Sequence, residues 1–221
     1  MNQLYSSLNQ IASNSFQIVS FLFFCYFYLY KHFFEPAGIL LEMNLNLNMG
    51  VSVMYDSNCI GRILSTSSPQ AIANICGSEE YENICGKVCF YDLGQGTLVA
   101  VSIEGIPTES ASCCQRVLGF HIHEGFRCSG SSEDPFADAG THFNPADCPH
   151  PIHAGDLPPL FVNNGMAWCA VITTRFSVSD VLGLTVIVHS DPDDFHTQPS
   201  GNSGKKIACG VITNTKGTAC V

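Results

Sequence analysis

The sequence predicts an all-β fold, an antiparallel sandwich or barrel, from three observations. Short segments rich in Val, Ile, Phe and Tyr recur along the chain between turn residues. The turn Asn163-Asn164-Gly165 separates two such segments and is a strong hairpin signal. No long amphipathic helical pattern occurs within 69–213. The eight predicted strands are Ala71–Cys76, Lys87–Asp92, Thr97–Ile103, Leu118–His123, Leu157–Val162, Met166–Thr173, Leu184–His189 and Ile207–Ile212.

Each predicted strand has its own boundary signals. The first three are separated by glycines at positions 77, 94, 96 and 105. The fifth and sixth flank the Asn-Gly turn, and the fourth and seventh each precede a long segment without strand character. These two segments, 124–156 and 190–206, contain too much Gly, Pro and Asp for strands. Long ordered loops in a compact domain are usually functional, so we expect the site to lie there.

The chain divides into four predicted regions. Residues 1–35 form a hydrophobic N-terminal segment, 36–68 a weakly structured linker, 69–213 the β domain and 214–221 a C-terminal tail. Within 41–49, apolar and polar residues alternate as in one edge strand. The uncharged run 16–30 is short for a bilayer span, and it has neither a preceding Lys or Arg nor a small-residue cleavage motif.

The N-terminal run leaves several alternatives open. It is an export signal, a membrane anchor, a buried helix or an upstream extension, and any membrane contact is expected only through 16–34. The chain has 12 cysteines, which suggests an oxidising compartment, and no CxxC pair repeats, which argues against a zinc ribbon. We therefore favour an extracytoplasmic or membrane-anchored location over a cytoplasmic one.

The charge balance excludes one class of function. The chain has nine Lys and Arg residues and 19 Asp and Glu residues, so its net charge is −10. No run of basic residues is present to neutralise phosphates, and we predict no nucleic-acid binding. The same negative charge repels small anions at long range.

Six of the eight histidines, with one aspartate, form a candidate two-metal site. His121 and His123 are two apart on a predicted strand, so both rings project to one face. Imidazole suits copper and zinc, and one carboxylate fits a zinc site. One shared ring would complete two groups of four: His121, His123, His142 and His189 for copper, and His142, His150, His153 and Asp156 for zinc.

Three other polar residues, Asp193, His32 and His196, are not predicted to be ligands. Asp193 lies four residues past His189 and is predicted to accept N–H groups from both sites, because a ligating imidazole needs an acceptor for its other nitrogen. His32 and His196 are interpreted as solvated or structural histidines.

These residues lie in motifs that resemble the copper/zinc superoxide dismutase family, particularly its bacterial forms. The motifs are G-F-H-I-H, G-T-H-F-N-P, H-A-G-D-L, V-I-V-H-S-D-P-D-D and G-N-S-G-K-K-I-A-C-G-V-I, and the resemblance covers about residues 69–213. It implies an eight-stranded Greek-key barrel, the copper and zinc sets given above, and a disulfide between Cys128 and Cys209. It also implies disproportionation of superoxide, with His142 leaving copper on reduction, carrying a proton and returning.

The chain departs from the family pattern at several positions. Lys206 stands where many members carry an arginine that guides the anion, so we expect weaker anion positioning with activity kept. Only two residues separate His150 from His153, and the segment between Cys128 and His142 is long. Cys148 is either a rival ligand or a disulfide partner of Cys113 or Cys114.

Two other functions remain as hypotheses. One is a non-catalytic copper-delivery or metal-binding relative of the same fold, and the other is a zinc-only structural domain. The complete copper set opposes both, although the adjacent cysteines at 113 and 114 keep the delivery hypothesis open. A homodimer is possible, but no diagnostic patch is visible in the sequence.

Overall fold

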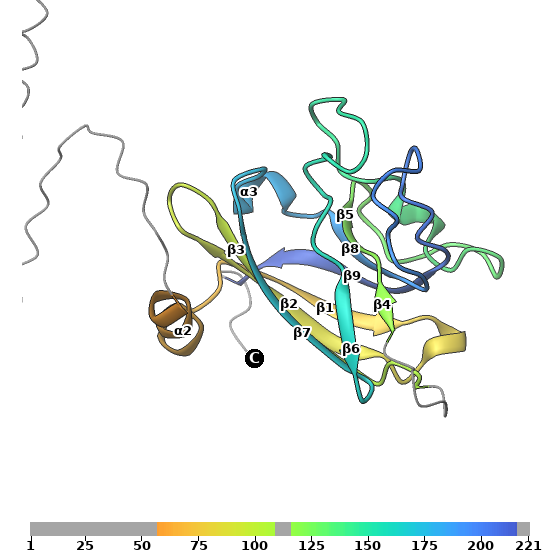
Figure 1. Ribbon diagram of the computed structural model, residues 1–221, viewed down its shortest axis with the longest axis horizontal. Coiled ribbons are helices and arrows are strands. Elements are labelled where there is room, and N and C mark those ends of the chain that lie inside the picture. The colour runs from red at the N-terminus through yellow and green to blue at the C-terminus, as the bar shows by residue number, and fades with distance from the viewer. Residues whose placement is uncertain (1–56, 109–115, 216–221) are drawn as a thin grey trace, which may run out of the picture. The chain divides into compact units, whose positions relative to one another are not determined.

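The computed structural model describes residues 57–108 and 116–215 as a nearly closed antiparallel barrel (Figure 1). This confirms the predicted all-β class. The strands are β1 (Ala71–Gly77), β2 (Cys85–Asp92), β3 (Thr97–Glu104), β4 (Val117–Leu118), β5 (Phe120–His123), β6 (Leu160–Asn163), β7 (Met166–Thr173), β8 (Thr185–His189) and β9 (Lys206–Asn214). The helices are α2 (Ser57–Thr66), α3 (Val178–Val181), η2 (Glu79–Tyr81) and η3 (Ala137–Ala139).

The sheet order is β4-β6-β7-β3-β2-β1-β9-β8-β5. Its two edge strands, β4 and β5, are consecutive in the chain and separated only by Gly119. The sheet therefore curls back on itself, and few backbone groups are left at an open edge. The loops after β5 and after β8, green to blue in Figure 1, lie beside β5 and β8.

The predicted strand Leu118–His123 is two strands, because the chain changes partners at Gly119. β4 pairs with β6, whereas β5 pairs with β8. Between them, the Gly119 N–H donates to Asp191 O at 2.8 Å, and Gly119 O accepts from His189 N at 2.9 Å. A Cβ at this position would lie 2.8 Å from Ser203 Cβ, so glycine permits the close approach. The barrel consequently has nine strands where eight were predicted.

Two other features of the structure differ from the sequence prediction. The predicted strand Leu157–Val162 begins at Leu160, since Pro158 and Pro159 have no N–H to donate to a ladder. The helix α2 lies in the region predicted as a linker and was not anticipated. Several predicted features lie outside the described residues. They are the N-terminal segment 1–35 with His32, the alternating stretch 41–49, and the adjacent cysteines at 113 and 114. Among the described helices, none is long and apolar enough to cross a membrane.

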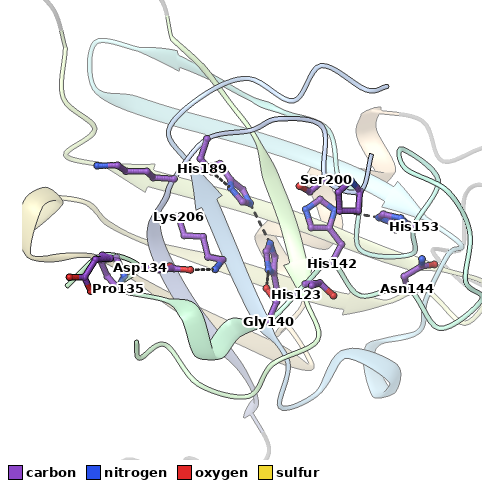
Figure 2. A pocket seen from close by; sticks show the side chains of 15 residues that line it. His123, Asp134, Pro135, Gly140, His142, Asn144, His153, His189, Ser200 and Lys206 are labelled. Carbon is purple, nitrogen blue, oxygen red and sulfur yellow. Dashed lines mark hydrogen bonds and ion pairs between the residues drawn. The ribbon is translucent and has the colours of Figure 1, made fainter. Parts of the chain in front are cut away.

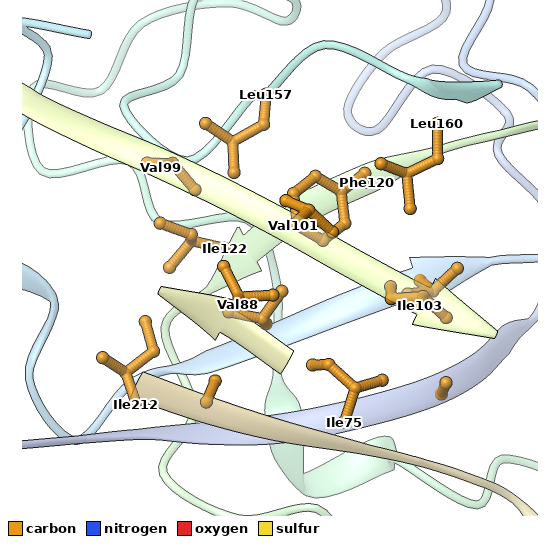
Figure 3. Close-up of a cluster of buried hydrophobic side chains, with 14 of the residues drawn as sticks. Ile75, Val88, Val99, Val101, Ile103, Phe120, Ile122, Leu157, Leu160 and Ile212 are labelled. Atoms are coloured by element: carbon orange, nitrogen blue, oxygen red, sulfur yellow. The ribbon is translucent and has the colours of Figure 1, made fainter. Parts of the chain in front are cut away.

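The core fills the barrel with side chains at alternate strand positions (Figure 3). On β3, Val99, Val101 and Ile103 are buried while Ser102 and Glu104 are exposed, as the two-residue period of a strand requires. Phe120 and Ile122 on β5 join the same cluster, so the two histidines that alternate with them are anchored on a packed strand.

A second, smaller cluster lies where the loop after β5 covers β8 and β9. Phe136 and Ala139 of the loop pack with Ile187, Cys209 and Cys128. Cys128 and Cys209 form the predicted disulfide, with Cα atoms 5.6 Å apart and a sequence separation of 81. The loop is therefore held to β9 by a covalent bond and by apolar burial.

Candidate metal centre

Seven buried side chains from three parts of the chain converge at the barrel wall. β5 supplies His121 and His123, and the end of β8 supplies His189. The loop after β5 supplies the other four, and isolated backbone bridges His121↔Asp156 and His123↔His142 align it with β5. All seven side chains that the sequence predicted as ligands are thus brought together: His121, His123, His142, His150, His153, Asp156 and His189.

The first group contains His121, His123, His142 and His189, each offering one nitrogen within 4.8 Å of the others. His123 Nε2 and His189 Nε2 are 3.3 Å apart. The opposite nitrogens are held by backbone carbonyls: His123 Nδ1 contacts Gly140 O at 2.9 Å, and His189 Nδ1 contacts Gly204 O at 3.5 Å (Figure 2). Four imidazoles without a carboxylate suit Cu(II).

The second group contains His142, His150, His153 and Asp156, with ligand atoms again within 4.8 Å of one another. His142 Nδ1 lies 2.7 Å from Asp156 Oδ1 and 3.4 Å from His153 Nδ1. Its Nε2 is therefore turned toward the first group, and the ring centroids of His142 and His121 are 4.0 Å apart. Three nitrogens and a carboxylate make a closed zinc set, with the His142 ring common to both groups.

The chain's own hydrogen bonding indicates that the site fits metal ions. Among the described residues, His121 Nδ1, His142 Nε2 and His150 Nδ1 are buried without a hydrogen-bond partner. His150 Nδ1 comes within 3.1 Å of Asp156 Oδ2 without hydrogen-bond geometry. A buried polar atom without a partner is costly, and all three nitrogens point into the two groups. A cation in each group would satisfy them.

Asp193 lies behind both groups and joins them. Its Oδ2 is 2.8 Å from His121 Nε2 and its Oδ1 is 2.9 Å from His150 Nε2. Each ring is oriented with its other nitrogen toward its group, as a carboxylate behind a ligating histidine does. The Phe195 N–H also donates to Oδ1, at 2.7 Å.

Four of the candidate ligands, His121, His123, His189 and Asp156, have lowered pKa values. Burial lowers the pKa of His121 and His123, and burial with the neighbouring His121 and His142 rings lowers the pKa of His189 to about 3. Burial acts to raise the pKa of Asp156, but the hydrogen bond and charge of His142 outweigh it, and the pKa is lowered. Neutral imidazoles and an ionised carboxylate are the metal-binding forms.

An open pocket of about 610 Å³ leads to the first group. Its lining includes His123, His142 and His189, which Figure 2 shows together with Lys206. Lys205 also lines the pocket. Lys206, predicted as the anion-guiding cation, lines this pocket but is ion-paired with Asp134. Its Nζ lies 2.6 Å from Asp134 Oδ2, and its side chain is 16% exposed.

Four residues around the site were missed by the sequence analysis. Asp134 neutralises Lys206, and Arg175 Nη1 donates to the carbonyls of His153 and Asp156, both at 3.1 Å. Gln198 joins the two loops by exchanging hydrogen bonds with the His150 backbone, at 3.0 and 2.7 Å. Asn144 closes the turn before the zinc set through the Cys148 backbone, at 2.8 and 3.0 Å. Only Asn144, inside G-T-H-F-N-P, stood in a motif that could have indicated it.

The remaining candidates are not part of either group. Cys148 is half-buried and belongs to neither ligand set, so the structure does not make it a rival ligand. His196 is exposed and contacts Asp194, in agreement with its interpretation as a solvated histidine.

Comparison with known proteins gives matches to one family. The family model described as copper/zinc superoxide dismutase (SODC) matches residues 84–212. The chain is 32% identical over 144 residues to superoxide dismutase [Cu-Zn] 2 of Aquifex aeolicus, covering 58% of this chain and 79% of that protein. It is 32% identical over 147 residues to superoxide dismutase [Cu-Zn] of Deinococcus radiodurans, covering 58% and 77%. It is 31% identical over 140 residues to the extracellular superoxide dismutase [Cu-Zn] of Mus musculus, covering 58% and 53%.

Proposed function

The chain belongs to the copper/zinc superoxide dismutase family, and from this premise we propose that its β domain disproportionates superoxide to oxygen and hydrogen peroxide. The observation that carries the proposal is the pair of four-ligand groups that share His142, with unpartnered ring nitrogens directed into them. Copper would be held by His121, His123, His142 and His189, and zinc by His142, His150, His153 and Asp156.

Copper would supply a one-electron redox couple at the pocket, and zinc would supply a fixed charge without redox chemistry. His142 serves both groups, with Nε2 toward the first and Nδ1 held beside Asp156. When Nε2 is not engaged by metal, it is the atom at which this ring holds a proton for the product. Lys205 and Lys206 line the approach and attract a small anion into an otherwise acidic molecule. This enzyme class is itself a standard example of such steering.

A non-catalytic copper-delivery role is less well supported. A carrier would be expected to lack part of the copper set, whereas all four imidazoles are present and buried here. The open pocket also reaches His123, His142 and His189, which suits access for a small substrate more than hand-off of an ion to a protein.

We also propose a location and an assembly for the chain. A structural disulfide supports an extracytoplasmic location, because such bonds persist in oxidising compartments. Exposed apolar side chains on β6 and β7, namely Phe161, Met166 and Trp168, support a homodimer. Membrane contact is proposed only through residues 16–34.

Reconstitution with both metals tests the function. We expect one copper and one zinc per chain by elemental analysis, together with superoxide dismutase activity. His123→Ala should lose copper and activity while retaining zinc, whereas His153→Ala, its matched partner in the other group, should primarily lose zinc. Binding of zinc alone when copper is supplied, or full copper loading without activity, would contradict the proposal.

A further inference from the structure

Three cysteines lie side by side across the outer face of the barrel. Cys76 on β1 is directly opposite Cys85 on β2 and also directly opposite Cys209 on β9. Opposed residues in an antiparallel sheet point to the same face. Figure 1 shows β2, β1 and β9 in this order along the wall.

The face is the outer one on independent grounds. Cys76 and Cys85 are exposed, and Ile75 next to Cys76 is buried in the barrel core. Cys209 packs away from that core, in the small cluster under the ligand loop, and is bonded to Cys128. Four cysteines therefore form a continuous row: Cys85, Cys76, Cys209 and Cys128.

The backbone pairing gives Cα separations that a disulfide can span. Gly77 N donates to Ile84 O at 2.9 Å, which makes Cys76 and Cys85 a non-hydrogen-bonded pair with Cα atoms about 4.5 Å apart. On the other side, Ser78 N donates to Ile207 O at 2.9 Å, which makes Cys76 and Cys209 a hydrogen-bonded pair, about 5.5 Å apart. Both separations fall within the Cα range of disulfides, about 4.4–6.8 Å.

We propose that Cys76 and Cys85 form a second, redox-active disulfide and that Cys76 exchanges it with the Cys128–Cys209 bond. Cys209 is 2% exposed and the Cys128 side chain is partly buried, so external thiols and disulfides reach this bond poorly. Cys76 is exposed and neighbours Cys209, so it connects the anchoring bond of the ligand loop to the solvent.

The exchange needs no external oxidant, because each step forms one S–S bond and breaks one. The Cys76 thiolate attacks Cys209 Sγ, the Cys76–Cys209 bond forms, and Cys128 leaves as a thiolate. The Cys85 thiolate then attacks Cys76 Sγ, forming Cys76–Cys85 and releasing Cys209 as a thiolate. In the reverse direction, a small-molecule disulfide oxidises the Cys76/Cys85 pair, releases two thiols, and the bond passes to Cys128 and Cys209.

The two exposed thiols have different surroundings. Cys85 Sγ lies 3.7 Å from Glu104 Oε1. Partial desolvation, with the charge and hydrogen bond of Glu104, raises the pKa of Cys85. A thiol whose pKa is raised forms less thiolate, so Cys85 acts second, as the thiol that resolves the bond to Cys76.

Disulfide mapping tests both steps on the reduced, zinc-loaded full chain. Trypsin with a Glu-specific protease places each of the four cysteines of the row on its own peptide. Cys76 lies on 63–79, Cys85 on 83–87, Cys128 on 128–133 and Cys209 on 207–216. After glutathione disulfide is added and samples are quenched with an alkylating reagent, peptide 63–79 linked to 83–87 should appear first. It should then decline as 128–133 linked to 207–216 rises.

Variants distinguish exchange through Cys76 from direct oxidation of Cys128 and Cys209 by glutathione disulfide. Cys76→Ser should slow formation of Cys128–Cys209 at least fivefold, whereas Cys89→Ser, a half-buried cysteine on the same strand as Cys85, should not. The Cys85→Ser/Cys128→Ser variant should link 63–79 to 207–216. Absence of the 63–79/83–87 link, or a wild-type rate in Cys76→Ser, overturns the proposal. Since no superoxide chemistry is measured, either result leaves the proposed enzyme activity to its own test.

Discussion

At the scale of single residues, the ion pair between Lys206 and Asp134 determines how strongly the pocket attracts anions. The ammonium that should draw superoxide lies 2.6 Å from a carboxylate, and Glu133 also lines the pocket. A paired cation presents little net charge to an approaching anion. Asp134 therefore weakens the attraction that Lys206 would exert alone.

Replacing these two residues should move the rate in opposite directions. Lys206→Ile should lower kcat/KM for superoxide by about tenfold and reduce its dependence on ionic strength, because the attracting ammonium is lost and the Asp134 carboxylate is left in the pocket without its partner cation. Asp134→Asn should raise kcat/KM by about threefold and tighten azide binding to the copper enzyme, since Lys206 is released from its partner. Pulse radiolysis and optical azide titration measure the two effects.

The control is Glu133→Gln, which removes one negative charge from the same pocket without touching the ion pair. It should change both quantities less than Asp134→Asn does. A wild-type rate and salt dependence in Lys206→Ile would assign the steering to another group, such as Lys205, which also lines the pocket.

At the scale of elements, the loop after β8 holds the two metal groups in register. Asp193 hydrogen-bonds to both His121 and His150, so a single loop residue orients one ring of each group. Gly201 makes this possible: its φ is +70°, and a Cβ there would clash with Asp193 Oδ1. The loop is therefore shaped around the carboxylate.

Asp193→Asn should weaken binding of copper and zinc, each by about 10- to 100-fold, because an amide cannot accept from both rings through two anionic oxygens. Competition with a chelator, followed by elemental analysis, measures the loss. Asp194→Asn is the matched control, since Asp194 bonds Thr197 and His196 within the loop and contacts no ligand ring. Equal metal loss in the two variants would mean that general loop disorder, and not ring orientation, is responsible.

At the scale of the whole molecule, a barrel wall that buries six histidines, three of them with a lowered pKa, is sensitive to acid. The pKa of His189 is about 3 in the folded protein, lowered by burial and by the His121 and His142 rings, against about 6.5 in the unfolded chain. The unfolded state binds the proton between these values, so folding stability is full above about pH 6.5 and is lost as pH falls toward 3. The lowered pKa values of His121 and His123 act with the same sign.

The urea midpoint of the metal-free protein should therefore fall steeply between about pH 7 and pH 4. His189→Gln should make that fall shallower, because one of the proton-linked groups is gone. His196→Gln should leave it unchanged, since His196 is exposed. A midpoint that does not depend on pH in this window would show that the histidines titrate equally in both states.

The sequence by itself determined the all-β class and indicated the candidate ligands that the structure brings together. Alternation of apolar and polar residues is a local property, and it placed His121 and His123 on one strand between core residues. The ligand loop was recognisable because His142, His150, His153 and Asp156 lie within one short segment of specific motifs. The Cys128–Cys209 pairing came from the resemblance to the family, and the structure confirms it.

Only the tertiary structure decided which distant groups meet. Asp134 and Lys206 are 72 residues apart, and Gln198 and His150 are 48 apart. Neither partner carries a local signal of the other. Likewise, Cys76 meets Cys209 only because β9 returns to pair with β1, which closure of the barrel imposes. Local patterns specify periodicity and donor chemistry, whereas contacts across a sheet depend on strand order and register, which are settled by the packing of the whole chain.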